Sequence, residues 1–83
     1  MQQTTLWAYD ELSEKQKRTL KKRILKLLED GDYTANEISV NLDVKISSIT
    51  GRLHELAAEG KIKKGFIRSD RFSGYRAYAW VLV

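Results

Sequence analysis

The stretch from residue 34 to residue 62 constrains the fold most, because its pattern predicts two short helices joined by a tight turn. Thr34 and Glu37 have the spacing of a capping box, in which each side chain satisfies a free backbone N–H at a helix start. Ile38 and Leu42 lie four residues apart, so they share one face of the first predicted helix. A short helix with one apolar face is therefore expected to begin directly after Thr34.

A second, longer helix is predicted after residues 43–45, where the helical pattern breaks. Its apolar positions recur at helical spacing and are expected to be buried: Ile46, Ile49, Leu53 and Leu56. Gly60 follows the last of them and is placed to end this helix as a left-handed C-cap.

Two helices that cross at a short turn are the skeleton of a helix-turn-helix, and the spacing here resembles that family. The buried positions of the family are matched by Ile38, Leu42, Val44 and Ile49. Ser39 stands where the family prefers a small residue, and Asp43 where it prefers glycine for a positive φ, which Asp tolerates better than most residues. Residues 53–62 are similar to the L-x-x-L-x-x-x-G-x-I exit into a wing strand, as in bacterial multiple-antibiotic-resistance and arsenic-repressor regulators.

The resemblance covers residues 13–83 and implies an α+β winged helix-turn-helix, with three helices and a C-terminal β-hairpin wing. A change to period-two alternation predicts wing strands over 61–68 and 75–83, with Asp32-Tyr33 as a stub third strand. On the last strand Tyr78, Trp80 and Leu82 share one face, which we assign to the core. The opposite face, with Ala77, Ala79 and Val81, is expected to stay small. The aromatic residues are alternatively a base-stacking platform, although core packing is favoured.

A further helix is predicted from Glu14 to Asp30, between a Ser13/Gln16 capping box and a C-cap at Gly31. Its apolar stripe is expected to pack on the helix-turn-helix and consists of Leu20, Ile24, Leu27 and Leu28. Its other faces carry seven cations: Lys15, Lys17, Arg18, Lys21, Lys22, Arg23 and Lys26. A solvated helix face is the favoured interpretation of these cations, and a secondary phosphate contact or an acidic partner is the alternative.

Residues 1–12 form an N-terminal arm without a clear period. Leu6, Trp7 and Tyr9 are too apolar for a solvated tail, so we expect them to pack on the domain or to form a homodimer contact. No apolar run approaches the ~18 residues of a membrane span, and the N-terminus lacks the apolar region of a signal peptide.

The composition excludes several classes of function. The chain has no cysteine and one histidine, so disulfides, thiolate metal sites and His-rich metal sites are not expected. His54 has no nucleophile beside it, the glycines are scattered singly, and the carboxylates show no metal-binding spacing. We therefore expect no enzymatic activity and no cofactor, and a cytoplasmic location in a prokaryotic or infected host cell.

Charge is unevenly distributed and favours a nucleic-acid partner. The net charge is +4, and residues 45–83 carry eight Lys or Arg against three Asp or Glu. Positive charge thus gathers on the second predicted helix of the motif and on the wing, which is typical of a DNA-binding face. General solubility is the plainer explanation of the same charge.

The resemblance implies a sequence-specific double-stranded DNA-binding protein, a small transcriptional regulator with its recognition helix over about 46–58 in the major groove. The wing, 61–76, would lie on the backbone or in the minor groove. The candidate DNA contacts are Lys45, Ser47, Ser48, Thr50, Gly51, Arg52, Lys63, Lys64, Arg68, Arg71 and Arg76.

Three of these residues have specific expected roles. Arg52, expected to flank the outer face of the helix, can make a bidentate contact to guanine or bind a phosphate. Arg71, at the tip of a flexible loop, is the candidate for minor-groove insertion. Gly51 costs about 1 kcal/mol inside a helix, so it either lets the backbone approach a groove or relieves crowding against another helix.

Two further hypotheses compete with this one. A winged-helix adaptor would bind an acidic protein partner, and a domain for Z-form nucleic acid would share the same layout. The second is disfavoured, because Thr50 and His54 stand where that family has its key Asn and Tyr. The segment 47–56 is also similar to small winged proteins of phages, other prokaryotic viruses and mobile elements.

Overall fold

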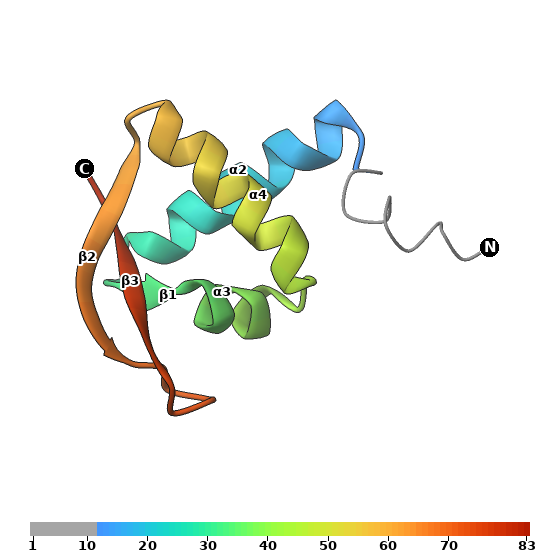
Figure 1. Cartoon of the computed structure of the whole chain (residues 1–83). Helices are drawn as coiled ribbons and strands as arrows, with labels where there is room; N and C mark the ends of the chain where they lie inside the picture. The colour runs from blue at the N-terminus through green and yellow to red at the C-terminus, as the bar shows by residue number, and fades with distance from the viewer. Residues whose placement is uncertain (1–11) are drawn as a thin grey trace.

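The computed structural model describes residues 12–83, which form three helices and a three-stranded antiparallel sheet (Figure 1). The elements in chain order are α2 (Glu14–Leu28), β1 (Tyr33–Thr34), α3 (Ala35–Leu42), α4 (Ile46–Ala58), β2 (Ile62–Ser69) and β3 (Arg76–Leu82). In Figure 1, α4 crosses in front of α2, the sheet lies at one side of the helices, and the loop between β2 and β3 projects past α3.

Both predicted capping boxes are confirmed. Ser13 accepts a hydrogen bond from the backbone N–H of Gln16 while the Gln16 side chain accepts one from the N–H of Ser13. Thr34 and Glu37 make the same reciprocal pair at the start of α3. Helix α2 ends at Leu28, two residues before the expected end, and Gly31 donates to the Leu28 carbonyl at 3.2 Å.

The turn of the helix-turn-helix forms around Asp43, which adopts the expected left-handed conformation with φ 56°. The N–H of Val44 donates to the Ser39 carbonyl at 3.1 Å, and the N–H of Asp43 donates to the Val40 carbonyl at 3.3 Å. The Ser39 hydroxyl donates to the Val44 carbonyl at 2.6 Å, which ties the two arms of the turn together.

Helix α4 ends at the predicted glycine. Gly60 has φ 78° and donates to the Ala57 carbonyl, and Lys61 donates to the Leu56 carbonyl, both at 3.0 Å. This pair of bonds is a Schellman motif, in which a glycine takes the left-handed position without a Cβ penalty. The chain then turns directly into β2.

The sheet has the order β1-β3-β2, with the expected stub strand at one edge. Tyr33 pairs with Trp80 across β1 and β3, and Ile67 pairs with Tyr78 across β2 and β3. The register of β2 shifts between Lys64 and Ile67, which indicates a β-bulge. Gly65 lies in this bulge, where an added Cβ would be 3.0 Å from the carbonyl oxygen of Ala79.

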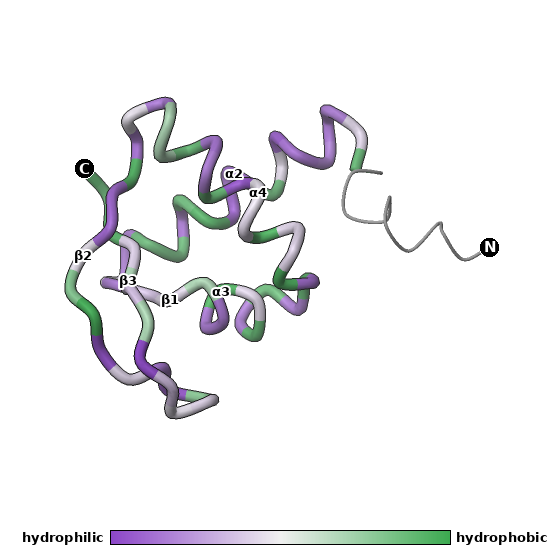
Figure 2. Tube along the Cα trace, viewed as in Figure 1, coloured by the Kyte–Doolittle hydropathy of each residue, from purple (hydrophilic) through white to green (hydrophobic). Residues whose placement is uncertain are grey.

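The core lies where the three helices meet the base of the hairpin, and Figure 2 shows hydrophobic positions alternating with hydrophilic ones along the helices. The buried apolar side chains in this cluster are Leu20, Ile24, Leu28, Ile38, Ile49, Leu53, Leu56, Ile62 and Trp80. Leu27, Leu42 and Val44, also expected to be buried, are partly buried against it.

Two expectations about the core are wrong. Ile46 is 45% exposed, because it is the first residue of α4 and lies at the N-terminal end of the helix. On β3 only Trp80 of the predicted core face is buried; Tyr78 and Leu82 are exposed, and Ala79 from the other face is fully buried. The alternation rule assumed a flat strand buried along its whole length, whereas the hairpin is bulged and projects past the helices.

The N-terminal arm lies almost entirely outside the described residues, and so does the contact expected for Leu6, Trp7 and Tyr9. Leu12, the last residue assigned to the arm, packs partly against the core cluster. Among residues 12–83, no helix is both long enough and apolar enough to span a bilayer.

Candidate nucleic-acid interface

The outer face of α4 carries small polar side chains, as expected. Ser47, Thr50 and His54 are exposed and Gly51 is half-buried. The Thr50 hydroxyl donates to the Ile46 carbonyl at 2.9 Å, which leaves its oxygen lone pairs and its methyl group facing outward. Lys45, at the N-cap, is also exposed.

Gly51 has open space on its outer side. A Cβ built on Gly51 meets no atom within 4 Å outside its own helix backbone and chain neighbours. The hypothesis that this glycine relieves crowding against another helix of the chain is therefore wrong for the described part of the molecule. The folded chain itself gives no packing reason for a residue that costs helix stability at this position.

Arg52 does not flank the outer face. Its side chain is only 7% exposed, and it donates from Nε and Nη2 to the two carboxylate oxygens of Glu55 at 2.9 and 2.8 Å. The expected guanine or phosphate contact would require this buried bidentate pair to break. Ser48, one turn earlier on the same side of α4, is also buried. Helical spacing alone misplaced both residues, because it does not show how the neighbouring elements pack on α4.

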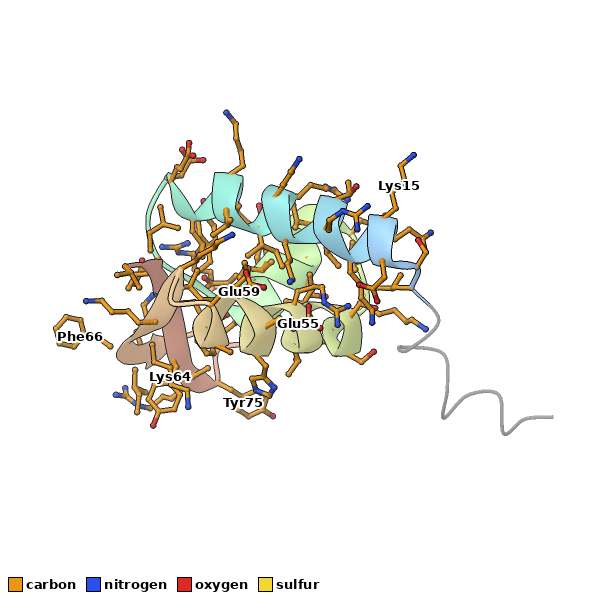
Figure 3. All side chains as sticks on the ribbon, turned by 90° about the horizontal axis from the view of Figure 1, so that it is seen from above. Lys15, Glu55, Glu59, Lys64, Phe66 and Tyr75 are labelled. Carbon is orange, nitrogen blue, oxygen red and sulfur yellow. The ribbon has the colours of Figure 1, made fainter. Side chains whose placement is uncertain are left out.

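Glu55 and Glu59 lie on the side of α4 that faces α2 (Figure 3). Lys21 of α2 contacts both carboxylates, at 3.4 Å from Glu55 and 2.7 Å from Glu59. Hydrogen bonds from Arg52 to Glu55 and from Lys21 to Glu59 lower the pKa of each carboxyl group, and the bond to Glu59 raises the pKa of Lys21. Both carboxylates are thus ionised and paired with cations of the same domain.

Arg68 is committed to the base of the wing. Its guanidinium donates to Glu37 at 2.7 and 2.8 Å and to the Asp32 carboxylate at 3.1 Å, so it is not the free cation that the sequence suggested. Glu37 is fully buried. The hydrogen bond from Arg68 lowers the pKa of Glu37 to about 2, against the opposing effect of burial and with the help of the Arg71 and Thr34 backbone N–H groups.

Arg71 also folds back on the domain. Its backbone N–H donates to Glu37 at 2.7 Å, and its guanidinium lies 3.5 Å from Glu37 and 3.8 Å from Asp32. The same group stacks over the Tyr33 ring, 5.4 Å from the centroid. Its side chain remains 55% exposed, but it is directed at β1 and α3 and does not extend from the loop tip as expected.

The wing loop is anchored, not free, and Asp70 is the anchor that the sequence analysis missed. The carboxylate of Asp70 is buried and accepts hydrogen bonds from the hydroxyl of Thr34, the side-chain amide of Asn36 and the backbone N–H groups of Phe72 and Ser73. Burial favours the neutral form, yet these bonds together hold the pKa of Asp70 well below its usual range. The signal in the sequence was a single acid in a basic hairpin, followed by turn-forming Ser73 and Gly74.

The remaining hairpin cations are available at the surface. Lys63, Lys64 and Arg76 are exposed, and none of them takes part in an ion pair within residues 12–83. The Lys64 ammonium lies over the Tyr78 ring, 4.7 Å from the centroid, and 6.0 Å from the Trp80 centroid. The surface that remains as a candidate interface consists of the outer face of α4 and three hairpin cations without an ion pair in residues 12–83.

Comparison with known proteins identifies the fold. No family model matches the sequence, and no curated protein matches it. Among solved structures, the chain is similar to a cysteine-to-serine mutant of Lactococcus lactis ZitR, with a TM-score of 0.66 and 23% sequence identity. The fold is a winged helix-turn-helix.

The similarity covers 78% of this chain but only 42% of the ZitR chain, so the chain spans less than half the length of that protein. At this level of identity the likeness establishes the fold and not the partner. The α+β winged fold expected from the sequence is confirmed, with its three helices, its C-terminal hairpin and its stub third strand.

Proposed function

We propose that this winged helix binds duplex DNA by laying the outer face of α4 in the major groove. The observation that carries the proposal is the open space beside Gly51 in the middle of that face. A missing side chain there lets the helix backbone approach base edges closely. Ser47 offers a hydroxyl group to bases or phosphates, and Thr50, whose proton is bound by the Ile46 carbonyl, offers an acceptor oxygen to base donors.

Phosphate contacts complete the proposed interface. No side chain within residues 12–83 caps the N-terminus of α4, so its free N–H groups and Lys45 favour a phosphate at that end. Lys63, Lys64 and Arg76 are the candidate backbone contacts of the wing, and because Lys63 and Lys64 alternate faces of β2, only one of these two is expected to point toward the backbone. Arg52 and Arg68 are instead bound by carboxylates of the domain, Ser48 is buried, and Arg71 is directed at Glu37 and Tyr33.

The role that fits such a module is a small transcriptional regulator. One winged helix makes few phosphate contacts, so we propose that it acts as a homodimer or on neighbouring sites. Leu6, Trp7 and Tyr9 are the proposed dimer contact. Sedimentation of the L6A/W7A double variant checks this step: the variant is expected to be monomeric and to bind a two-site duplex more weakly than the parent.

The central test compares two variants on the same face of the same helix. Gly51→Gln should abolish binding to a duplex selected from a random pool, because the new side chain fills the space closest to the bases. Ala58→Gln, at the C-terminal end that the proposal leaves outside the groove, should bind like the parent. Equal binding by both variants in a fluorescence anisotropy titration contradicts this placement of α4.

A second function, docking of an acidic protein, is favoured by one observation on α2. Its exposed cations Lys15, Arg18, Lys22 and Lys26 form no ion pair with any residue from 12 to 83. Beside them lie two grooves of about 470 and 560 Å³ whose walls include apolar side chains. An adaptor would show no tight, steeply salt-dependent association with random duplex DNA, whereas the DNA-binding proposal requires one.

A further inference from the structure

The hairpin exposes an unusual amount of aromatic surface. Of the nine large hydrophobic side chains exposed between residues 12 and 83, five lie between residues 66 and 78. Their exposed fractions are 89% for Phe66, 47% for Ile67, 56% for Phe72, 78% for Tyr75 and 47% for Tyr78. These side chains contribute little to the core of the domain. Duplex binding does not explain them either, because contacts with duplex phosphates require cations and not aromatic rings.

One of the exposed aromatic rings, that of Tyr78, lies beside a cation. Tyr78 carries the Lys64 ammonium over its ring, and Arg76, two residues earlier on β3, projects from the same face of the strand. In Figure 3, Lys64 and Tyr75 project from the same side of the hairpin, whereas Phe66 points in another direction. We call Lys64, Tyr75, Arg76 and Tyr78 the aromatic face.

The aromatic face carries two cations and no acid of the hairpin itself, and Asp32, which lines one hollow together with Lys64, is already paired with Arg68. The only acid between residues 62 and 82 is Asp70, which is buried and accepts hydrogen bonds from the loop and from α3. A second copy of the chain would bring identical cations together, which opposes self-association through this face. A polyanion that also presents flat apolar surfaces is the complementary partner.

We propose that the aromatic face binds unpaired bases of single-stranded nucleic acid. In a duplex the faces of the bases are stacked on one another, so only unpaired bases are free to stack on Tyr75 and Tyr78. Lys64 and Arg76 would contact the phosphates between the stacked bases, as in other sites where cations track a single strand. This activity goes beyond duplex binding and uses none of the α4 residues.

The test compares two probes of equal length and charge. One is a fluorescently labelled single strand of about a dozen thymidines, and the other is the same deoxyribose-phosphate chain without bases. Anisotropy titrations of the full chain at constant salt are expected to show tighter binding of the thymidine strand. Equal affinity for the two probes means that only phosphates are recognised, and this overturns the proposal.

Substitutions at Tyr75 separate stacking from general apolar contact. Tyr75→Ala and Tyr75→Leu should each weaken binding of the thymidine strand by about 5-fold to 150-fold, the measured range for loss of one stacked base, whereas Tyr75→Phe should bind like the parent. Tyr78→Ala should behave like Tyr75→Ala. Val40→Ala removes an exposed apolar side chain on α3 and serves as the matched control, with no loss expected.

Two other results would overturn the proposal. Affinity that is retained in Tyr75→Leu shows that any apolar side chain suffices, and sedimentation that shows self-association lost in Tyr75→Ala makes a second copy the occupant. The outcome is independent of duplex binding, because Gly51→Gln is expected to retain single-strand binding. Circular dichroism of each variant confirms that loss of binding is not loss of folding.

Discussion

At the scale of single residues, the buried carboxylates at the wing base make stability depend on pH. Because the pKa of Glu37 is about 2 in the folded chain and about 4.5 when unfolded, the unfolded chain binds more protons between these pH values. Stability is therefore fully present above about pH 4.5 and is lost as the pH falls toward 2. Denaturant unfolding of the parent should show this loss, on the order of 3 kcal/mol from Glu37.

Glu37→Gln is expected to flatten part of that pH dependence and to lower stability at pH 7, since Arg68 loses one of its two charged partners and keeps only Asp32. Asp70, whose pKa is also depressed, supplies the remaining slope. If the Glu37→Gln variant loses as much stability at low pH as the parent, the buried ion pair is not the source of the pH dependence.

Two glycines test whether the space beside the backbone is open at Gly51 and filled at Gly65, as the structure indicates. Gly51→Ala should raise stability by about 1 kcal/mol, because alanine favours a helix and its Cβ enters open space. Gly65→Ala should lower stability, because its Cβ would lie 3.0 Å from the backbone carbonyl of Ala79. Thermal unfolding of both variants measures the two changes in stability. Equal changes in melting temperature would contradict the packing described for the bulge.

At the scale of elements, Glu55 of α4 joins Arg52 of the same helix to Lys21 of α2. Arg52→Ala should lower stability by roughly 1–3 kcal/mol, because it removes a bidentate bond to Glu55. The DNA sequence that the Arg52→Ala variant selects from random duplexes should match the sequence selected by the parent. A changed base preference with unchanged stability would show that Arg52 leaves this interface to contact DNA.

The same scale separates what the sequence predicted from what it did not. Caps and turns were predictable, since Ser13, Thr34, Asp43 and Gly60 act on neighbours within five residues. The pairing of Glu37 with Arg68 joins positions 31 residues apart, and no local sequence pattern predicts it. The site was predictable where it depends on the outer face of one helix, and was misjudged where Glu55 of α4 and Glu37 of α3 bind the arginines.

At the scale of the whole molecule, the free cations fall into two groups. Lys15 on α2 and Lys64 on the hairpin project from opposite sides of the domain (Figure 3). If duplex DNA is bound through the α4 and wing side, Lys63→Gln should weaken binding to all sequences and reduce the salt slope by about one. Lys22→Gln on α2 is the matched control and should change neither, whereas a reduced slope in Lys22→Gln alone would assign the phosphates to α2.

The most direct test of the central claim is an NMR titration of the full chain with a duplex selected from a random pool. Backbone amide shifts are expected to concentrate at residues 45–51 and 63–64 and to leave the exposed face of α2 unchanged. Shifts that gather instead on residues 15–26, with none at Ser47 or Gly51, would contradict the claim that α4 lies in the major groove.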